Sequence, residues 1–309
     1  MEATTAVCIL RRCKGHSSAL IMIIIIITTT IKVPVKKKLK AILLAGGLGT
    51  RAKPFTDYSP KALIPIHGRP AIDHLARYLS KFSCVSEIII VCEFDSFGRQ
   101  IINYFEGKEK IIGKRITFIE DKKKGTGGSI LHAEESVRDD GFFLVWFADN
   151  LCALQIDGLI AEYNKVIDEY KNQVLGVLVV SKKRHEETGR VILEDNNAAA
   201  NSLIKEFIEK PVVTLDCPEA AGIYLFNNNI FGVLHSKSRE SNNGTFDLSY
   251  DILAKVPSVG EYKLASYEIS RSNTYWIDIE SPAHMDRNRK TVDKILLQMQ
   301  SSIPGRQPC

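Results

Sequence analysis

Leu44-Ala45-Gly46-Gly47-Leu48-Gly49-Thr50-Arg51 is the stretch that decides the fold of this chain. It follows an apolar run at residues 40–44, which predicts a β-strand. Glycines in a turn after a strand let backbone N–H groups approach phosphate oxygens, because no Cβ stands in the way. Arg51 adds a permanent cation where the tail of a triphosphate would lie. The stretch therefore predicts a strand followed by a phosphate-binding loop.

Two other glycine-rich nucleotide loops fit this stretch poorly. A Walker A loop ends in Gly-Lys-Ser or Gly-Lys-Thr, which is absent here. A dinucleotide-binding loop needs the spacing G-x-G-x-x-G and an acid about 20 residues further on. The three glycines lack that spacing, and the acids after the second predicted strand, Glu93 and Asp95, lie too far downstream. An NAD-binding oxidoreductase is therefore the weaker interpretation.

Beyond the loop, short apolar runs alternate with amphipathic stretches. Strands are predicted at residues 87–92, 115–120, 142–147 and 174–180, and helices at residues 70–82, 97–105, 128–137 and 156–170. This order predicts an α/β domain with a Rossmann-like, mainly parallel sheet flanked by helices. After residue 181, strands at residues 190–194, 203–209 and 221–226 predict an added antiparallel portion. The remaining predictions are helices at residues 228–235, 248–255 and 282–300, and strands at residues 262–268 and 275–279.

Further motifs follow the loop in a fixed order. They are Pro54-Phe55-Thr56, Pro60-Lys61-Ala62-Leu63-Ile64-Pro65-Ile66, Gly125-Thr126-Gly127-Gly128, Ala148-Asp149-Asn150, Glu209-Lys210-Pro211, Ala221-Gly222-Ile223-Tyr224-Leu225-Phe226 and Trp276-Ile277-Asp278-Ile279. Together with the loop, these motifs closely resemble the sugar-1-phosphate nucleotidyltransferase family over residues 39–300. The resemblance implies the nucleotide-diphospho-sugar transferase fold. It also implies a reaction that joins a nucleoside triphosphate to a hexose 1-phosphate and releases pyrophosphate.

The resemblance assigns roles to individual positions. It implies that Arg51 and the loop hold the β- and γ-phosphates, that Lys61 contacts the α-phosphate, and that Lys210 contacts the sugar phosphate. Asp149 and Asp278 would bind Mg²⁺, which prefers hard oxygen ligands. The implied nucleotide-binding residues are Leu44, Ala45, Gly46, Gly47, Gly49, Thr50, Gly127 and Gly128. The implied sugar-binding residues are Gly189, Glu209 and Gly222.

The residue types and their positions, taken without the resemblance, support only some of these assigned roles. An in-line attack at the α-phosphorus needs two anions to be positioned and their charge neutralised, so cations and a metal are expected. Asp149 follows a strongly apolar strand, where an acid at the carboxyl end points toward the ligand crevice of a parallel sheet. Alone, Asp149 would be interpreted as a capping acid and Lys210 as a surface residue. Trp146 and Phe147 are predicted to be core residues.

The chain departs from the family pattern at four places. Ala52-Lys53 stands where Leu-Arg is usual, and Ala148 replaces a glycine before the metal-binding acid. Ala221 stands where Asn is frequent, and Glu280 replaces the glycine that follows the Asp278 segment. None of these changes removes a charged group that the chemistry needs.

The sequence leaves the substrates open. Residues 125–128 are most similar to guanylyltransferases that act on mannose 1-phosphate, while dTTP or UTP with glucose 1-phosphate fits nearly as well. A non-catalytic homologue that binds nucleotide sugars and regulates an active partner is an alternative of another class. Retention of all five charged residues named above disfavours that alternative.

Composition bounds the remaining possibilities for this chain of 309 residues and net charge +5. The excess of positive charge gathers in the first forty residues, so a nucleic-acid-binding face is not predicted. Seven cysteines without a CxxC pair suit a reducing, cytoplasmic location.

Three regions are expected. Residues 1–38 are expected to be a disordered extension, residues 39–300 the nucleotidyltransferase domain and residues 301–309 a tail. The apolar run at residues 19–27 falls short of the roughly 20 residues that span a bilayer. Membrane contact is therefore disfavoured, and a homo-oligomer remains an open expectation.

Overall fold

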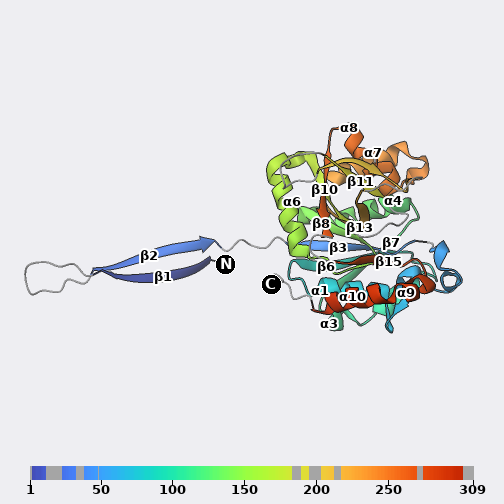
Figure 1. Cartoon of the computed structure of the whole chain (residues 1–309), viewed down its shortest axis with the longest axis horizontal. Helices are drawn as coiled ribbons and strands as arrows, with labels where there is room; N and C mark the ends of the chain where they lie inside the picture. The colour runs from blue at the N-terminus through green and yellow to red at the C-terminus, as the bar shows by residue number, and fades with distance from the viewer. Residues whose placement is uncertain are drawn as a thin grey trace, which may run out of the picture. The chain divides into compact units, whose positions relative to one another are not determined.

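The computed structural model describes residues 2–11, 23–32, 38–47, 49–182, 189–194, 203–211, 217–269 and 274–301. The chain divides into two units, Met1–Lys37 and Lys38–Cys309. In the first unit, β1 (Glu2–Arg11) pairs antiparallel with β2 (Ile23–Lys32) (Figure 1). The division of the chain into extension, domain and tail stays a prediction.

The second unit is built on a nine-stranded sheet. Its central strand β3 (Leu39–Leu44) runs parallel to β6 (Val85–Cys92) and to β8 (Phe142–Phe147), and β6 runs parallel to β7 (Arg115–Glu120). Such strands are almost continuously apolar because both faces of a parallel sheet are covered by helices. The predicted mixed α/β fold with a mainly parallel sheet is confirmed.

The antiparallel portion differs from the prediction in one strand. β13 (Glu219–Asn227) lies inside the main sheet, antiparallel to both β8 and β10 (Val174–Ser181). Beyond it, β14 (Lys263–Glu268) pairs parallel with β10. On the other side, β11 (Arg190–Leu193) joins β13 to β12 (Ile204–Ile208). The pattern of residues identified the strand at 221–226. Which strands pair with it is decided by contacts with segments distant in the sequence.

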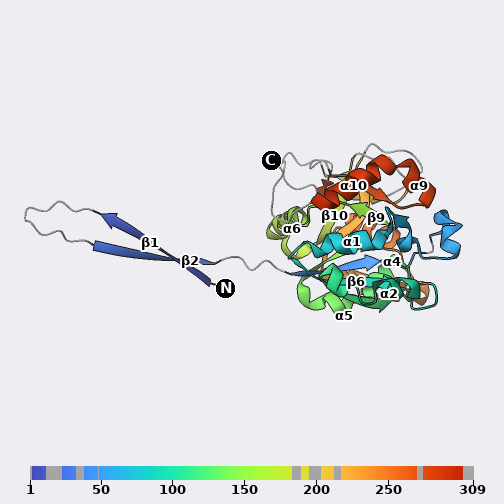
Figure 2. The same cartoon turned by 90° about the horizontal axis from the view of Figure 1, so that it is seen from below.

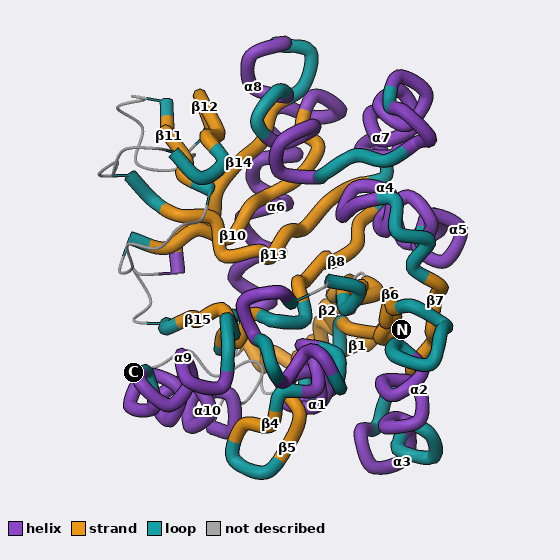
Figure 3. The backbone as a smooth tube through the Cα atoms, turned by 90° about the vertical axis from the view of Figure 1, so that its right-hand side faces the viewer, coloured by secondary structure: helices purple, strands orange, loops and turns teal. Residues whose placement is uncertain are grey.

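Helices cover both faces of the sheet (Figure 3). Their bounds are α1 (Ala71–Ser80), α2 (Arg99–Phe105), α3 (Glu109–Ile112), α4 (Gly125–His132), α5 (Glu134–Val137), α6 (Ile156–Tyr170), α7 (Asn229–Glu240), α8 (Val256–Val259), α9 (Pro282–Arg287) and α10 (Arg289–Ser301). α1 and α10 lie side by side on one face (Figure 2), and α4 and α7 pack on the other. Among the described residues, no helix combines the length and apolar character needed to cross a membrane.

Alternation along β3 divides the core into two layers. Ala41 and Leu43 face the layer that includes Leu75 of α1, whereas Ile42 faces the layer that includes Ile130 of α4. Successive side chains of a strand point to opposite faces, so one apolar strand supplies both layers. The burial of both layers holds β3 in the middle of the sheet, and the chain leaves it at the glycine-rich loop.

Two predicted helices are each interrupted. The helix predicted at residues 282–300 is split near Asn288 into α9 and α10, and the one at residues 128–137 is split into α4 and α5. Ser281 caps α9, since its Oγ accepts a hydrogen bond from the backbone N–H of His284 at 3.1 Å. A small second sheet pairs β15 (Trp276–Asp278) with β9 (Asn150–Cys152).

Candidate active site

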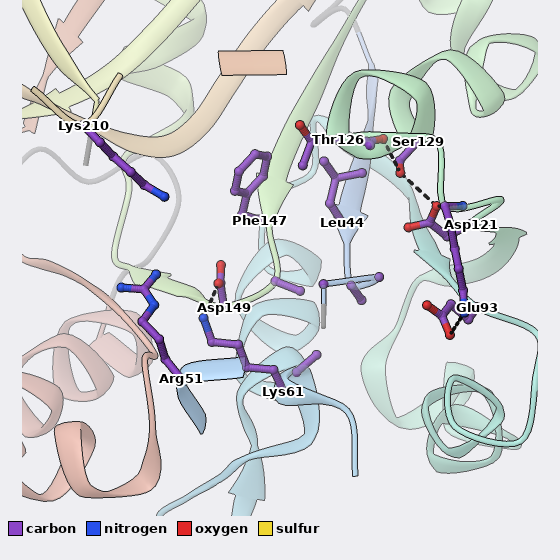
Figure 4. A pocket seen from close by; sticks show the side chains of 17 residues that line it. Leu44, Arg51, Lys61, Glu93, Asp121, Thr126, Ser129, Phe147, Asp149 and Lys210 are labelled. Carbon is purple, nitrogen blue, oxygen red and sulfur yellow. Dashed lines mark hydrogen bonds and ion pairs between the residues drawn. The ribbon is translucent and has the colours of Figure 1, made fainter. Parts of the chain in front are cut away.

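A cleft of about 590 Å³ opens at the carboxyl ends of β3, β6, β7 and β8 (Figure 4). Ligand crevices of parallel sheets lie at this edge because successive strand ends converge there. The cleft is lined by Leu44, Ala45, Gly46, Gly47, Arg51, Lys61, Ala62, Glu93, Asp121, Lys123, Gly125, Thr126, Ser129, Phe147, Ala148, Asp149 and Lys210. Arg51, Lys61 and Lys210, with Asp149 beside them, form what we call the cationic end. Asp121 and Glu93 form the acidic end.

The glycine-rich loop forms the floor of the cleft. A Cβ on Gly46 would lie 1.9 Å from Oδ2 of Asp121, so a larger residue there would have to displace this carboxylate. A Cβ on Gly47 would meet no atom within 4 Å, so the space above this residue is open to a ligand. Gly49 adopts φ +60° before the short 3₁₀ helix Thr50–Ala52. Neither Gly49 nor Thr50 lines the cleft.

Three predicted cations meet at the cationic end. The Nζ of Lys61 donates to Oδ2 of Asp149 at 2.6 Å, and only 12% of the lysine side chain is exposed. The Nη1 of Arg51 donates to Oε1 of Glu280 at 2.7 Å. Lys210 is exposed, and it reaches the cleft from a backbone with φ +45° that follows β12. Residues far apart in sequence therefore place positive charge around one cavity.

Of the two predicted metal ligands, Asp278 ends β15 and Asp149 lies in the turn just before β9. Asn150 of β9 is paired with Asp278 of β15, and the backbone N–H of Ile279 donates to the carbonyl oxygen of Asp149 at 2.6 Å. Of these two acids, Asp149 lines the cleft. No group of three or more His, Cys, Asp or Glu side chains suited to a metal occurs in the described part of the chain. Mg²⁺ is often bound by one or two carboxylates together with substrate phosphates, and the assignment of Asp149 and Asp278 to this ion stays a prediction.

The acidic end is built by α4 and by the residues after β6 and β7. Oδ1 of Asp121 accepts hydrogen bonds from the backbone N–H of Lys123 at 2.9 Å and from Oγ of Ser129 at 3.1 Å. The other oxygen, Oδ2, points into the cleft (Figure 4) and has no hydrogen bond among the described residues. The carboxylate is thus held in place with one acceptor atom facing the ligand space.

Gly127 and Gly128, which are predicted to bind the nucleotide, lie beside the cleft wall formed by the start of α4. Both are buried and neither lines the cleft, whereas Gly125 and Thr126 do. A Cβ on Gly127 would lie 2.3 Å from the ring of Phe246, and the N–H of Gly127 already donates to the carbonyl oxygen of Phe246. These glycines allow close packing, so α4 presents its first two residues to the cleft instead.

Of the three predicted sugar-binding residues, two lie close to each other. A Cβ on Gly189 would lie 2.8 Å from Oε2 of Glu209, so these two residues are close together. Gly222 packs on Asn150, and none of the three lines the cleft described above. Burial raises the pKa of Glu209 to about 7; Lys210 opposes this shift and Asp247 adds to it.

Several lining residues were missed from the sequence. Glu93 and Asp121 each follow directly on a predicted strand, and this position was the signal that could have identified them. We expected Phe147 to be a core residue, but it lines the cleft, so that prediction is corrected. Its neighbour Trp146 is fully buried as expected. Alternation at the end of β8 explains the difference, because adjacent residues face opposite sides.

Comparison with known proteins agrees with this architecture. The family model described as "Nucleotidyl transferase" matches residues 40–290, so the chain belongs to the nucleotidyl transferase family.

Individual relatives share this region of the chain. The bifunctional protein GlmU of Methanococcus maripaludis is 32% identical over 267 residues, which cover 86% of this chain and 57% of the relative. A mannose-1-phosphate guanyltransferase of Candida albicans is 27% identical over 246 residues, covering 79% of this chain and 62% of the relative. The chain thus spans less than two thirds of the length of these curated relatives.

A solved structure supports the fold independently. The UDP-glucose pyrophosphorylase of Acinetobacter baumannii aligns with a TM-score of 0.61 at 19% identity, covering 87% of this chain and 96% of that structure. At this level of identity, the similarity concerns the fold alone.

Proposed function

We propose that this protein is a sugar-1-phosphate nucleotidyltransferase, which forms an NDP-sugar and pyrophosphate from a nucleoside triphosphate and a hexose 1-phosphate. The observation that carries the proposal is the gathering of Arg51, Lys61, Lys210 and Asp149 around one cleft floored by a glycine-rich loop. Two polyanions can approach each other only where their charge is neutralised, and this arrangement supplies that neutralisation.

In this proposal, each of the three cations binds a different phosphate group. An oxygen of the sugar 1-phosphate forms a bond to the α-phosphorus. The bond from that phosphorus to the bridging oxygen breaks, and pyrophosphate leaves with the electron pair. Lys210 holds the attacking phosphate, Lys61 holds the α-phosphate, and Arg51 holds the leaving pyrophosphate. Since the attacking group is already an anion, no general base is needed.

Asp149 and Asp278 are the proposed ligands of Mg²⁺. If bound there, the ion would be held by these two carboxylates and would supply positive charge that offsets the charge of the phosphates. In the protein alone, Lys61 neutralises Asp149 at 2.6 Å. The lysine therefore has to shift its hydrogen bond from the carboxylate to a phosphate oxygen once substrates enter.

The acidic end favours a guanine nucleotide. Oδ2 of Asp121 can accept hydrogen bonds but cannot donate one while it is ionised. Guanine presents two adjacent donors, N1–H and the N2 amino group, along one edge. Uracil and thymine present one donor between two carbonyl oxygens, which a carboxylate repels. We therefore propose GTP as the nucleotide, with mannose 1-phosphate as the first sugar phosphate to test. The Candida albicans relative is named for this pair of substrate classes.

The alternative substrates are dTTP or UTP with glucose 1-phosphate. A cytoplasmic location and a homo-oligomer remain proposals. A non-catalytic, nucleotide-sugar-binding regulator is the alternative of another class, and the retained charges of the cleft disfavour it.

The test is a screen of GTP, ATP, UTP and dTTP against mannose 1-phosphate and glucose 1-phosphate, with pyrophosphate release as the readout. We expect release to require both substrates, to be highest with GTP and to stop when EDTA removes divalent ions. If pyrophosphate is released with UTP or dTTP and not with GTP, the alternative substrates would be the correct ones. A complete lack of release with every pair would move the interpretation to the regulatory homologue.

A further inference from the structure

Glu280 is a departure from the family pattern that the proposed mechanism leaves unexplained. It stands two residues after Asp278, where a glycine is usual, and it contacts the residue assigned to the leaving pyrophosphate. Its Oε1 accepts a hydrogen bond from Nη1 of Arg51 at 2.7 Å across 229 positions of sequence. A glycine at position 280 could make no such contact.

The backbone fixes Glu280 beside the catalytic groups. Ile279, the preceding residue, donates its N–H to the carbonyl oxygen of Asp149 at 2.6 Å, and β15 pairs with β9 just before it. The side chain of Glu280 is 27% exposed, whereas that of Arg51 is 54% exposed. The acid is therefore the more enclosed partner of this pair.

An arginine held by a carboxylate is a weaker ligand for phosphate. One donor of the guanidinium is occupied, and the charge of the pair is close to zero. A phosphate group that binds Arg51 has to displace Glu280, or share the guanidinium with it at close range to a like charge. Both routes weaken the binding of the β- and γ-phosphates, while the α-phosphate at Lys61 is unaffected.

We propose that Glu280 competes with the β- and γ-phosphates for Arg51, and thereby lowers the affinity of this cleft for polyphosphates and eases the release of pyrophosphate. The inference rests on the proposed function, because that function places the triphosphate tail at Arg51. Glu280 acts through Arg51 and touches no reacting atom, so it is a positioning residue.

A purely structural role for the ion pair of Arg51 and Glu280 predicts the opposite change in ligand affinity. If the pair only stabilised the loop, its removal would loosen Arg51 and weaken the binding of every ligand. Competition predicts tighter binding that is confined to ligands with phosphates beyond the α-position. The nearby pair of Lys53 and Asp57 offers a matched comparison, since its atoms lie 3.0 Å apart on the same loop and neither residue lines the cleft.

The experiment measures equilibrium binding to the full chain without sugar phosphate, so it does not depend on turnover. Dissociation constants are compared for GTP, GMP, UTP, UMP and inorganic pyrophosphate. Glu280→Gln removes the charge at constant size, and Glu280→Ala also removes the contact. Asp57→Asn is the control that removes an equal charge from the neighbouring pair.

We expect both Glu280 variants to bind the triphosphates and pyrophosphate about threefold to tenfold more tightly, with monophosphate binding unchanged. The control should bind all ligands as the unmodified protein does. In an Arg51→Gln background, Glu280→Gln should have a clearly smaller effect, because the competition for the arginine is then lost.

Weaker or unchanged triphosphate binding in both Glu280 variants would overturn the inference. An undiminished effect in the Arg51→Gln background would overturn it as well, since Glu280 would then act on the phosphates directly. If binding follows the expected pattern but no substrate pair turns over, the competition stands and the proposed catalytic function fails.

Discussion

Lys61 and Asp149 form the most enclosed charge pair of the cationic end. Their hydrogen bond of 2.6 Å joins the segment after the glycine-rich loop to the end of β8. A lysine so placed can exchange a carboxylate for a phosphate oxygen without moving far. Its contact should matter most when charge shifts at phosphorus, because interactions that strengthen in the transition state accelerate the reaction.

Lys61→Ala is therefore expected to lower kcat more than it raises KM. Loss of a fixed cation at the reacting phosphate should reduce kcat by about 10²–10³-fold. Steady-state kinetics with GTP and mannose 1-phosphate would measure this, with Lys53→Ala as the control on the same loop. Unchanged kcat with a raised KM would mean that Lys61 contributes only to ground-state binding.

Strands position the site, and β13 shows how a single glycine allows it. Gly222 has φ +66°, and a Cβ there would lie 2.3 Å from Nδ2 of Asn150. Asn150 is buried, and its carbonyl oxygen accepts a hydrogen bond from Nε1 of Trp146 at 2.9 Å. The close approach of β13 to residue 150 thus supports the segment that carries Asp149.

Gly222→Ala should destabilise the fold by about 2–4 kcal/mol, from the left-handed backbone and the overlap with Asn150 together. Gly141→Ala separates these two causes. Gly141 has φ +76° but no atom within 4 Å of its Cβ position, so this change should cost only about 1 kcal/mol. Urea denaturation would measure both variants, and equal losses would show that the contact with Asn150 contributes nothing.

For the molecule as a whole, Glu209 links stability to pH. Its pKa is raised to about 7 mainly by burial, so the folded protein retains a proton that the unfolded chain has lost above about pH 4.5. Where the folded state binds more protons than the unfolded state, stability falls as pH rises. The loss develops between about pH 4.5 and pH 7 and is complete above pH 7.

Glu209→Gln should therefore stabilise the protein at pH 8 and have little effect at pH 4.5. Because the side chain keeps some contact with water, the expected gain at pH 8 is about 1 kcal/mol. Unfolding by urea at the two pH values would measure it. Glu206→Gln, an exposed acid on β12, is the control and should show no such pH dependence. A gain of equal size at both pH values would contradict burial of the charged form as the cause.

The sequence alone determined the order of strands and helices and the glycine-rich loop. These features are local, because apolar periodicity and glycine turns reflect the backbone conformation at their own positions. The charged residues of the cationic end were named from the resemblance to a family, since their local patterns alone did not distinguish them from surface or capping residues. Only the tertiary structure decided that β13 lies between β8 and β10, that Asp121 faces the cleft while Gly127 and Gly128 are buried, and that Glu280 pairs with Arg51. Each of these three arrangements depends on contacts between segments that are distant in sequence. The pattern of residues within one segment does not show which other segment it will contact.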